Sequence, residues 1–229
     1  ESLNLQARKL GAKICHHTKV LGIEVLGGKV REVITDRGAI KTNTAVNAAG
    51  AWGGAIGAMV GLKVPITPFQ MAMLVTEQLP PCISHPIMGA SYMVDEDTSK
   101  EGQLGCGLIA SQQASGNLLI GGSWRDAGYD KRTSQEEIEL MARVDVRSMP
   151  SLKDVRVIRS YANFFPHTPD DLPILGKVDK IEGFIMACGH NGHGVGLGPG
   201  SGKLIQELIC EGKTSIPLDE LSLSRFDSK

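Results

Sequence analysis

The stretch from Gly183 to Leu208, GFIMACGHNGHGVGLGPGSGKLIQEL, has the residue types and spacing best suited to bind a ligand. An apolar run, Phe184–Ala187, predicts a strand. A loop follows with glycines at positions 189, 192, 194, 196, 198, 200 and 202, and an amphipathic helix comes after it. Glycine lets the backbone approach a ligand closely, and the first N–H groups of a helix carry partial positive charge. The pattern predicts a site for a phosphate, a carboxylate or an electron-rich ring, and leaves open which of these binds.

The same stretch offers few other chemistries. His190 and His193 have HxxH spacing, but no third ligand stands beside them, so we predict no metal site. Cys188, just before the loop, is interpreted as a small buried hydrophobic residue without a redox role.

The composition narrows the class of protein. The chain has 229 residues with 24 Lys+Arg against 25 Asp+Glu, and no basic stripe, so nucleic acid is not an expected partner. The five cysteines form no CxxC pair, which indicates reduced thiols and a cytoplasmic protein. No apolar run is long enough to span a bilayer. The chain begins at Glu1 within an apparent helix, so we interpret it as a fragment. It would be either part of a truncated protein or a naturally separate subunit.

The elements that must position the glycine loop are predicted to be strands and short helices. Gly27-Gly28 joins two β-rich runs and predicts a hairpin. Prolines at 65 and 68 mark the point where the chain crosses into its next segment. Further on, a helix capped by Thr133 or Ser134 is expected. This pattern predicts an α+β fold with an inserted layer of antiparallel strands and one helix. The predicted strands are 19–26, 29–35, 39–43, 44–52, 69–76, 90–94, 104–110, 117–121, 155–165 and 184–187.

Four spaced motifs together resemble the D-amino-acid oxidase/sarcosine oxidase family of FAD-dependent oxidoreductases. They are VNAAGAW at 46–52, GLKVPITP at 61–68, TPDDLPILG at 168–176 and GHNGHGVGLGP at 189–199. The resemblance implies that 1–64 and 166–229 belong to a partial FAD-binding domain and that 65–165 forms the substrate domain. The family's opening GxGxxG unit, which holds the ADP half of FAD, is not in this sequence.

The resemblance also implies which residues contact the cofactor. The alternative is a structural strand–helix turn that needs glycine for its geometry alone. Relatives similar to monomeric sarcosine oxidase carry a substrate-binding lysine where this chain has Gly196, and some members tether flavin through a cysteine where it has Asn163. Non-covalent FAD is therefore expected. The implied cofactor residues are Ala49, Gly50, Ala51, Trp52, Gly189, His190, Asn191, Gly192, His193, Gly194, Val195, Gly196 and Leu197.

The substrate pocket is predicted only from place in the family pattern, at Gln70, Tyr161, Asn163 and Phe165, each of which could instead be plain core or rim. The resemblance implies that the whole enzyme oxidises the C–N bond of an amine or amino acid by hydride transfer to flavin. No catalytic residue is assigned, and this chain alone is expected to be inactive. Two alternatives stay open: a non-catalytic binding or assembly subunit of a heteromeric flavin dehydrogenase, and a phosphate-binding module. The substrate, the electron acceptor and the oligomeric state are not specified by the sequence.

Overall fold

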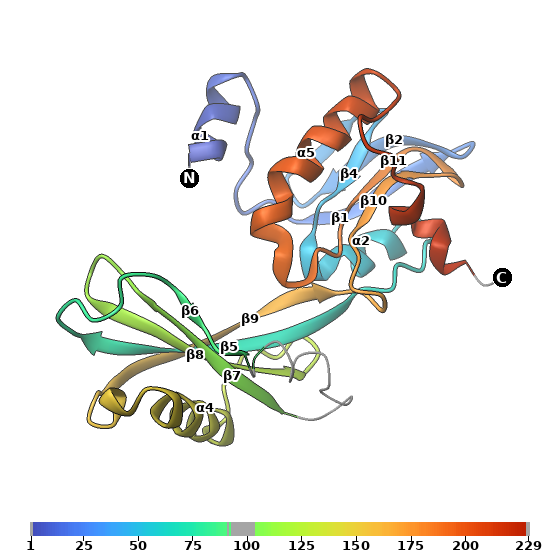
Figure 1. Cartoon of the computed structure of the whole chain (residues 1–229). Helices are drawn as coiled ribbons and strands as arrows, with labels where there is room; N and C mark the ends of the chain where they lie inside the picture. The colour runs from blue at the N-terminus through green and yellow to red at the C-terminus, as the bar shows by residue number, and fades with distance from the viewer. Residues whose placement is uncertain (1, 91, 93–103, 228–229) are drawn as a thin grey trace.

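The computed structural model describes residues 2–90, 92 and 104–227, and places them in two sheets joined by two long strands (Figure 1). The first sheet has six strands in the order β1-β2-β11-β10, with β3 paired to β2 and β4 paired to β11. Its strands are β1 (Val20–Leu26), β2 (Lys29–Thr35), β3 (Gly38–Lys41), β4 (Ala45–Asn47), β10 (Ile174–Val178) and β11 (Ile181–Cys188).

The second sheet has five strands, all antiparallel, in the order β6-β7-β8-β5-β9. Strands β5 and β9 run from this sheet toward the first one, so the two sheets share a double connection (Figure 1). The strands are β5 (Thr67–Gln78), β6 (Ile87–Met88), β7 (Gly105–Gln112), β8 (Asn117–Asp126) and β9 (Val157–His167).

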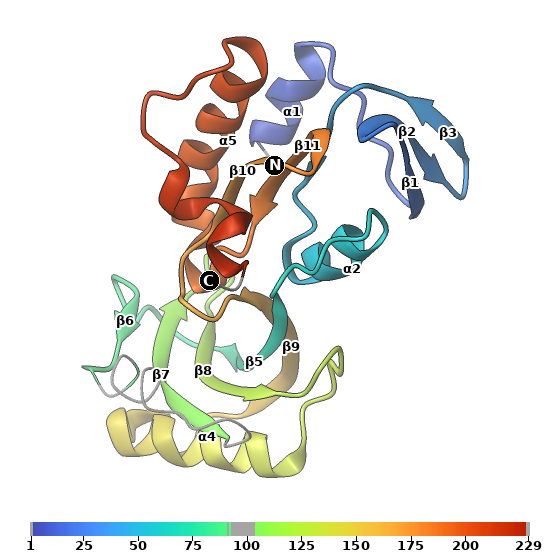
Figure 2. The ribbon, with the colours of Figure 1, turned by 90° about the vertical axis from the view of Figure 1, so that its right-hand side faces the viewer.

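Short helices accompany both sheets. Figure 2 shows α5 beside the first sheet and α4 beneath the second. The α-helices are α1 (Ser2–Lys9), α2 (Gly53–Ala58), α4 (Gln135–Ser148) and α5 (Gly194–Cys210), and the 3-10 helices are η1 (Gly50–Trp52), η2 (Pro150–Leu152), η3 (Asn191–His193), η4 (Asp219–Leu221) and η5 (Leu223–Phe226).

The predicted hairpin is present between β1 and β2. Gly27 and Gly28 both have positive φ, of 59° and 76°, as the tight two-residue turn requires, and Leu26 pairs with Lys29 across it. The strand expected over 44–52 is shorter than predicted, because β4 ends at Asn47 and the chain then turns into η1. The strand expected at 90–94 is wrong at its two described residues, Ala90 and Tyr92, which are helical, and its other residues lie outside the described part of the chain.

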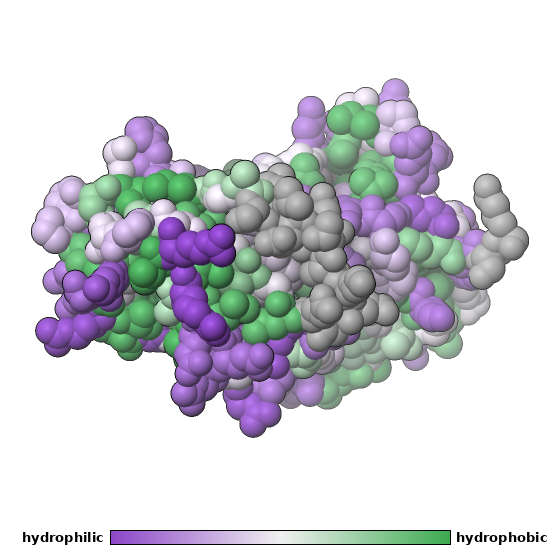
Figure 3. Space-filling view, turned by 60° about the horizontal axis from the view of Figure 1, so that its bottom comes forward, coloured by the Kyte–Doolittle hydropathy of each residue, from purple (hydrophilic) through white to green (hydrophobic). Residues whose placement is uncertain are grey.

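Residue alternation in β5 decides which face of the second sheet packs on α4. Ala72 and Leu74 are fully buried and belong to one core cluster with Met141 of α4, whereas the odd-numbered residues from 69 to 75 are only half buried. The sheet therefore has a packed face on α4 and a second face, whose β5 and β9 part we call the open face. On the β8 part of that second face, Trp124 lies opposite Met71 and is buried against Tyr92. On the α4 side of the molecule, hydrophilic side chains stand between hydrophobic patches (Figure 3).

Helix α4 begins at a capping box, which resolves the choice between two caps. The Ser134 hydroxyl accepts a hydrogen bond from the Glu137 N–H at 3.2 Å, and the Glu137 carboxylate accepts one from the Ser134 N–H at 2.7 Å. Ser134 is thus the cap, and Thr133 instead shares a hydrogen bond with Ser160.

The expectation of a glycine loop continuing to residue 202 is wrong. Helix α5 begins at Gly194 and contains Pro199 and five glycines within its first three turns. Glycine and proline are the poorest helix formers, so propensity alone predicted a loop here. The later turns supply the packing that isolated propensity lacks, since Ile205 of α5 is buried.

The architecture confirms the α+β fold class. One core lies on the first sheet around Phe184 and Met186, and the other lies between α4 and the second sheet. No helix in the described part of the chain has the length and apolar character needed to cross a membrane.

Candidate functional site

The loop after β11 is held by a pair of hydrogen bonds to the TPDDLPILG motif. The Asn191 Oδ1 atom accepts a hydrogen bond from the Thr168 N–H at 3.0 Å, and the Asn191 amide donates to the Thr168 hydroxyl at 3.3 Å. Thr168 is fully buried and donates its hydroxyl to the Leu172 carbonyl at 2.9 Å. Two motifs whose contacting residues are 23 positions apart in the sequence thus form one rigid unit.

Gly189 is the first residue of this loop, and both its backbone conformation and the space around it disfavour any other residue. Its φ is +75°, and a Cβ atom there would lie 2.7 Å from Cγ2 of the buried Thr168. Because Thr168 is itself fixed, a side chain at position 189 would displace the loop.

His190 connects the loop to α5. Its Nε2 lies 2.8 Å from the Ser201 hydroxyl, and burial lowers the pKa of His190, so the ring is neutral near pH 7. His193 is instead the N-cap residue of α5 and makes no side-chain cap hydrogen bond. Within the described residues no three His, Cys, Asp or Glu side chains gather as a metal site would need.

The first turns of α5 present a bare backbone surface. A Cβ atom at Gly196, Gly198, Gly200 or Gly202 would meet no atom within 4 Å, and Val195 is 96% exposed. No side chain caps this helix, so its first N–H groups keep their partial positive charge for another acceptor. These features fit a flat, electron-rich ring such as the FAD isoalloxazine.

The VNAAGAW motif lies at the same end of the first sheet as the glycine loop. Strands β4 and β11 are parallel neighbours, with Val46 opposite Ile185, so both strands end at one sheet edge. The buried Asn47 amide donates to the Gly53 carbonyl at 2.9 Å, and its Oδ1 accepts from the Ala49 N–H at 3.3 Å. The residues between, Ala49 to Trp52, are therefore held in a fixed turn, in which Gly50 has φ +54°.

Cys188 lies under this turn at the end of β11. A Cβ atom at Gly53 would be 3.1 Å from the Cys188 Sγ, which shows how closely α2 approaches the strand. Burial raises the pKa of the Cys188 thiol to about 12, so it stays protonated at neutral pH. This is the environment of a structural cysteine.

An aromatic cluster that the sequence analysis missed connects this turn to the second sheet. Trp52 stacks on Tyr129, with ring centroids 5.6 Å apart, and meets the Phe164 ring edge-on at 6.0 Å. The Tyr129 hydroxyl donates to the Ala51 carbonyl at 2.9 Å, and Lys131 Nζ lies 5.6 Å from the Trp52 ring centroid. The run AGYDKR after β8 has a turn residue followed by an aromatic one, but nothing in it indicates the distant partner.

Three of the four predicted pocket residues share one face of β9. Tyr161, Asn163 and Phe165 alternate along the strand, and Phe165 Cε2 lies 3.6 Å from where a Gly192 Cβ would be. The structure therefore brings the Phe165 end of this face against Gly192 of the glycine loop.

Gln70 is placed elsewhere. Its fully buried side chain donates to the Asp130 carbonyl at 2.6 Å and the Arg132 carbonyl at 3.1 Å, and accepts from the Arg125 Nε at 2.8 Å. These contacts lie on the packed face of the sheet, so Gln70 positions the loop after β8 and does not join the other three residues.

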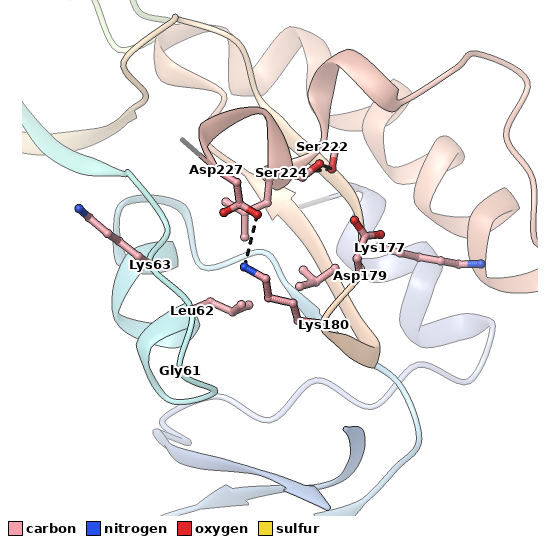
Figure 4. A pocket seen from close by; sticks show the side chains of 11 residues that line it. Gly61, Leu62, Lys63, Lys177, Asp179, Lys180, Ser222, Ser224 and Asp227 are labelled. Atoms are coloured by element: carbon pink, nitrogen blue, oxygen red, sulfur yellow. Dashed lines mark hydrogen bonds and ion pairs between the residues drawn. The ribbon is translucent and has the colours of Figure 1, made fainter. Parts of the chain in front are cut away.

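A cavity of about 250 Å³ lies away from these residues, between the end of α2, the end of β10 and η5 (Figure 4). Lys63, Lys177 and Lys180 line it together with Asp179 and Asp227, and Lys180 forms an ion pair with Asp227 at 3.3 Å. None of the predicted site residues lines this cavity, so we assign the glycine loop and the open face of β9 as the candidate site.

The first sheet is mixed, and the helix after β11 begins without a side-chain cap. The second sheet is antiparallel, so the class is an α+β protein with two sheets, whose glycine loop we interpret as the candidate cofactor site. Comparison with known proteins gives the particular family. Residues 1–208 match the family model described as "FAD dependent oxidoreductase".

Relatives and solved structures agree with this match. The chain is 32% identical to the hydrogen cyanide synthase subunit HcnC of Pseudomonas protegens over 93% of this chain and 47% of that protein. It is 28% identical to a glycine oxidase of Pseudomonas putida over 84% of this chain and 48% of that protein. An L-proline dehydrogenase structure from P. horikoshii superposes with a TM-score of 0.84 at 26% identity, covering 97% of this chain and 57% of the other.

The chain belongs to the family of FAD-dependent oxidoreductases, which confirms the family and the cofactor that its motifs indicated. It spans about half the length of the curated relatives it matches.

Proposed function

We propose that the protein containing this chain oxidises the C–N bond of an amine or amino acid, with non-covalently bound FAD as the hydride acceptor. The observation that carries the proposal is the contact between the bare glycine loop and the open face of β9, at Gly192 and Phe165. It supports the proposal because the loop that would hold the cofactor lies beside the face that would hold the substrate. Relatives described as glycine oxidase and D-amino acid dehydrogenase support the reaction class.

The residues of this chain would contribute binding and charge stabilisation. FAD would supply the acceptor for the hydride that leaves the carbon next to nitrogen; the nitrogen gives up a proton, and water then hydrolyses the resulting imine. The uncapped N–H groups of α5 would stabilise negative charge that develops above them. Asn163 offers no thiol for a covalent bond to flavin, and neutral His190 holds the loop to α5 through Ser201.

We further propose that residues 1–64 and 166–229 form the FAD-binding part and 65–165 the substrate part. The strands of the first sheet come from residues 20–47 and 174–188, and those of the second from 67–167. The five free cysteines support a reducing, cytoplasmic location as part of this proposal.

FAD binding to the intact protein tests the cofactor site directly, by the visible spectrum and by quenching of FAD fluorescence. Val195→Glu places a carboxylate in the first turn of α5, where it favours the helix but repels an electron-rich ring. We expect weaker FAD binding with unchanged thermal stability. Ile209→Glu, which adds the same charge at the exposed far end of the helix, is the matched control. Equal FAD affinity in both variants would place the cofactor elsewhere.

A second candidate function is a binding or assembly subunit, because some relatives are described as subunits, among them HcnC and the sarcosine oxidase subunit beta of Rhodobacter capsulatus. In that case FAD would bind only after a partner chain is added. Size-exclusion chromatography of the protein with and without candidate partners distinguishes the two functions. Tight binding of inorganic phosphate without FAD would instead favour a simple phosphate-binding module.

A further inference from the structure

The open face of the second sheet begins at the glycine loop and consists of alternate residues of β5 and β9. Phe69 is paired with Phe165, Met71 with Asn163, and Met73 with Tyr161. Directly opposed residues on antiparallel strands project from the same face. Three rows of side chains therefore lead away from the loop, at about 7 Å between alternate residues along a strand.

The side chains in these rows are apolar or neutral. A Cβ atom at Gly122 of β8 would lie 3.0 Å from the Met71 Cε and 3.2 Å from the Met73 Sδ, so both methionines extend over β8 on this face. Asn163 and Tyr161 are exposed, and Phe69, Met71 and Phe165 are half buried. Methionine and phenylalanine adapt well to an apolar ligand.

At this end of the sheet, the negative and the positive side chains of β8 lie on different faces. Asp126 lies opposite Phe69 in the first row and adds a carboxylate to the open face. Arg125 lies on the packed face, where it contacts Gln70 and Glu137 at 2.8 and 3.3 Å.

Phe164, like Arg125, faces away from the open face. Lys131 lies against Phe164, and the Lys131 Nζ is 5.3 Å from the Phe164 ring centroid. Along the described strands β5, β8 and β9, the lysine or arginine on the open face nearest the loop is Arg159, opposite Val75. It lies about 20 Å along the strand from Phe165.

We propose that this face selects amines that carry an uncharged, apolar substituent over α-amino acids that carry a carboxylate. The proposal rests on the proposed function and names its substrate class. Among the described residues of β5, β8 and β9, a carboxylate placed over these rows would lose water without gaining a lysine or arginine beside the loop, whereas Asp126 attracts the ammonium form of an approaching amine. The apolar substituent would lie over Phe69, Met71 and Phe165.

Benzylamine and phenylglycine test this directly, because they differ only by the carboxylate. The measurement is the rate of flavin reduction in the intact flavoprotein without oxygen. We expect benzylamine to reduce the flavin about tenfold faster, or more, at equal concentration. Faster reduction by phenylglycine would overturn the substrate class and leave the proposed function standing. Reduction by neither compound would overturn both.

Arginine substitutions locate the selectivity on the open face. Phe165→Arg supplies the missing cation beside the loop, and we expect the phenylglycine-to-benzylamine ratio to rise about tenfold. Ile158→Arg puts the same charge on the other face of β9, at a residue that is 62% exposed, and should leave the ratio unchanged. Asn163→Arg, one row further on, replaces Phe165→Arg if that variant does not fold. An equal ratio in the variants of both faces would refute the assignment.

Methionine methyl NMR gives a readout that is independent of turnover. In protein labelled with 13C-methyl methionine, benzylamine should shift the signals of Met71 and Met73, assigned through leucine substitutions. The fully buried Met141 on α4 is the internal control. Shifts at Met141 alone, or at none of the three, would mean that the ligand does not occupy the open face.

Discussion

Asp145 of α4 is a buried acid whose protonation should control stability. Its side chain is 1% exposed, and neither carboxylate oxygen has a hydrogen-bond partner within the described chain. It lies in the last turns of the helix, where the dipole also disfavours negative charge, beside a cavity of about 100 Å³ lined by Leu74, Leu152 and Lys153 among others. Burial raises the pKa of Asp145 from 3.8 to about 7.

The sign of the effect follows from proton binding. The folded protein keeps this proton up to about pH 7, whereas the unfolded chain releases it near pH 4, so the free energy of unfolding falls as pH rises between these values. A rise from 3.8 to about 7 corresponds to about 4 kcal/mol at high pH. About 2.5 kcal/mol of that develops between pH 5 and pH 8.

Asp145→Asn removes the charge and keeps the shape. We expect the variant to gain about 2.5 kcal/mol over the wild type between pH 5 and pH 8, as measured by urea denaturation at both values. Asp154→Asn, at an exposed aspartate, is the matched control and should show no such gain. A stability difference between Asp145→Asn and wild type that is the same at both pH values would refute the reasoning. It would mean that the carboxylate is paired in solution, for example by Lys153.

Three further predictions concern the elements that hold the site. Gly189→Ala should destabilise the protein by about 2 kcal/mol or more, because φ is +75° and the new Cβ would lie 2.7 Å from the Thr168 Cγ2. Chemical denaturation measures this loss of stability. Gly198→Ala, at a position with a helical backbone and open space around it, should not destabilise the protein. Ser134→Ala should cost about 1 kcal/mol by removing one bond of the capping box, whereas Thr133→Ala leaves that bond intact. Tyr129→Phe removes the hydrogen bond to the Ala51 carbonyl but keeps the stacking on Trp52, so we expect a loss of about 1 kcal/mol with little change in tryptophan fluorescence; a large fluorescence change would contradict the cluster.

Local signals allowed much of the fold to be predicted. The hairpin at Gly27-Gly28 needs positive φ at both residues, and few residues other than glycine adopt this. The capped start of α4 is likewise predicted by four consecutive residues, Ser134 to Glu137. The start of α5 was missed because five of its first nine residues are glycine, so the local preference opposed the structure that packing stabilises.

The candidate site depended on contacts that cross the sequence. The motif pattern indicated Phe165 and the glycine loop separately, but only the fold shows Phe165 against Gly192. Gln70 has a polar side chain of the kind that lines pockets. Its even-numbered position in β5 places that side chain on the packed face, as only the fold shows. Tyr129 and Phe164 carried no signal, because aromatic residues near strand ends are common in cores as well as in sites.

Strands β5 and β9 link the two surfaces that the proposed reaction needs. Phe165 meets the glycine loop and Phe164 meets Trp52 of the VNAAGAW motif, so opposite faces of one strand end contact both of the motifs that we propose to bind the cofactor. Because β9 pairs with β5 from Thr67 to Thr76, a shift of the pocket relative to the loop would break many hydrogen bonds at once. In the proposed reaction, substrate orientation would therefore be set by the same backbone that positions the glycine loop, which favours catalysis by fixed geometry over catalysis by a mobile acid or base.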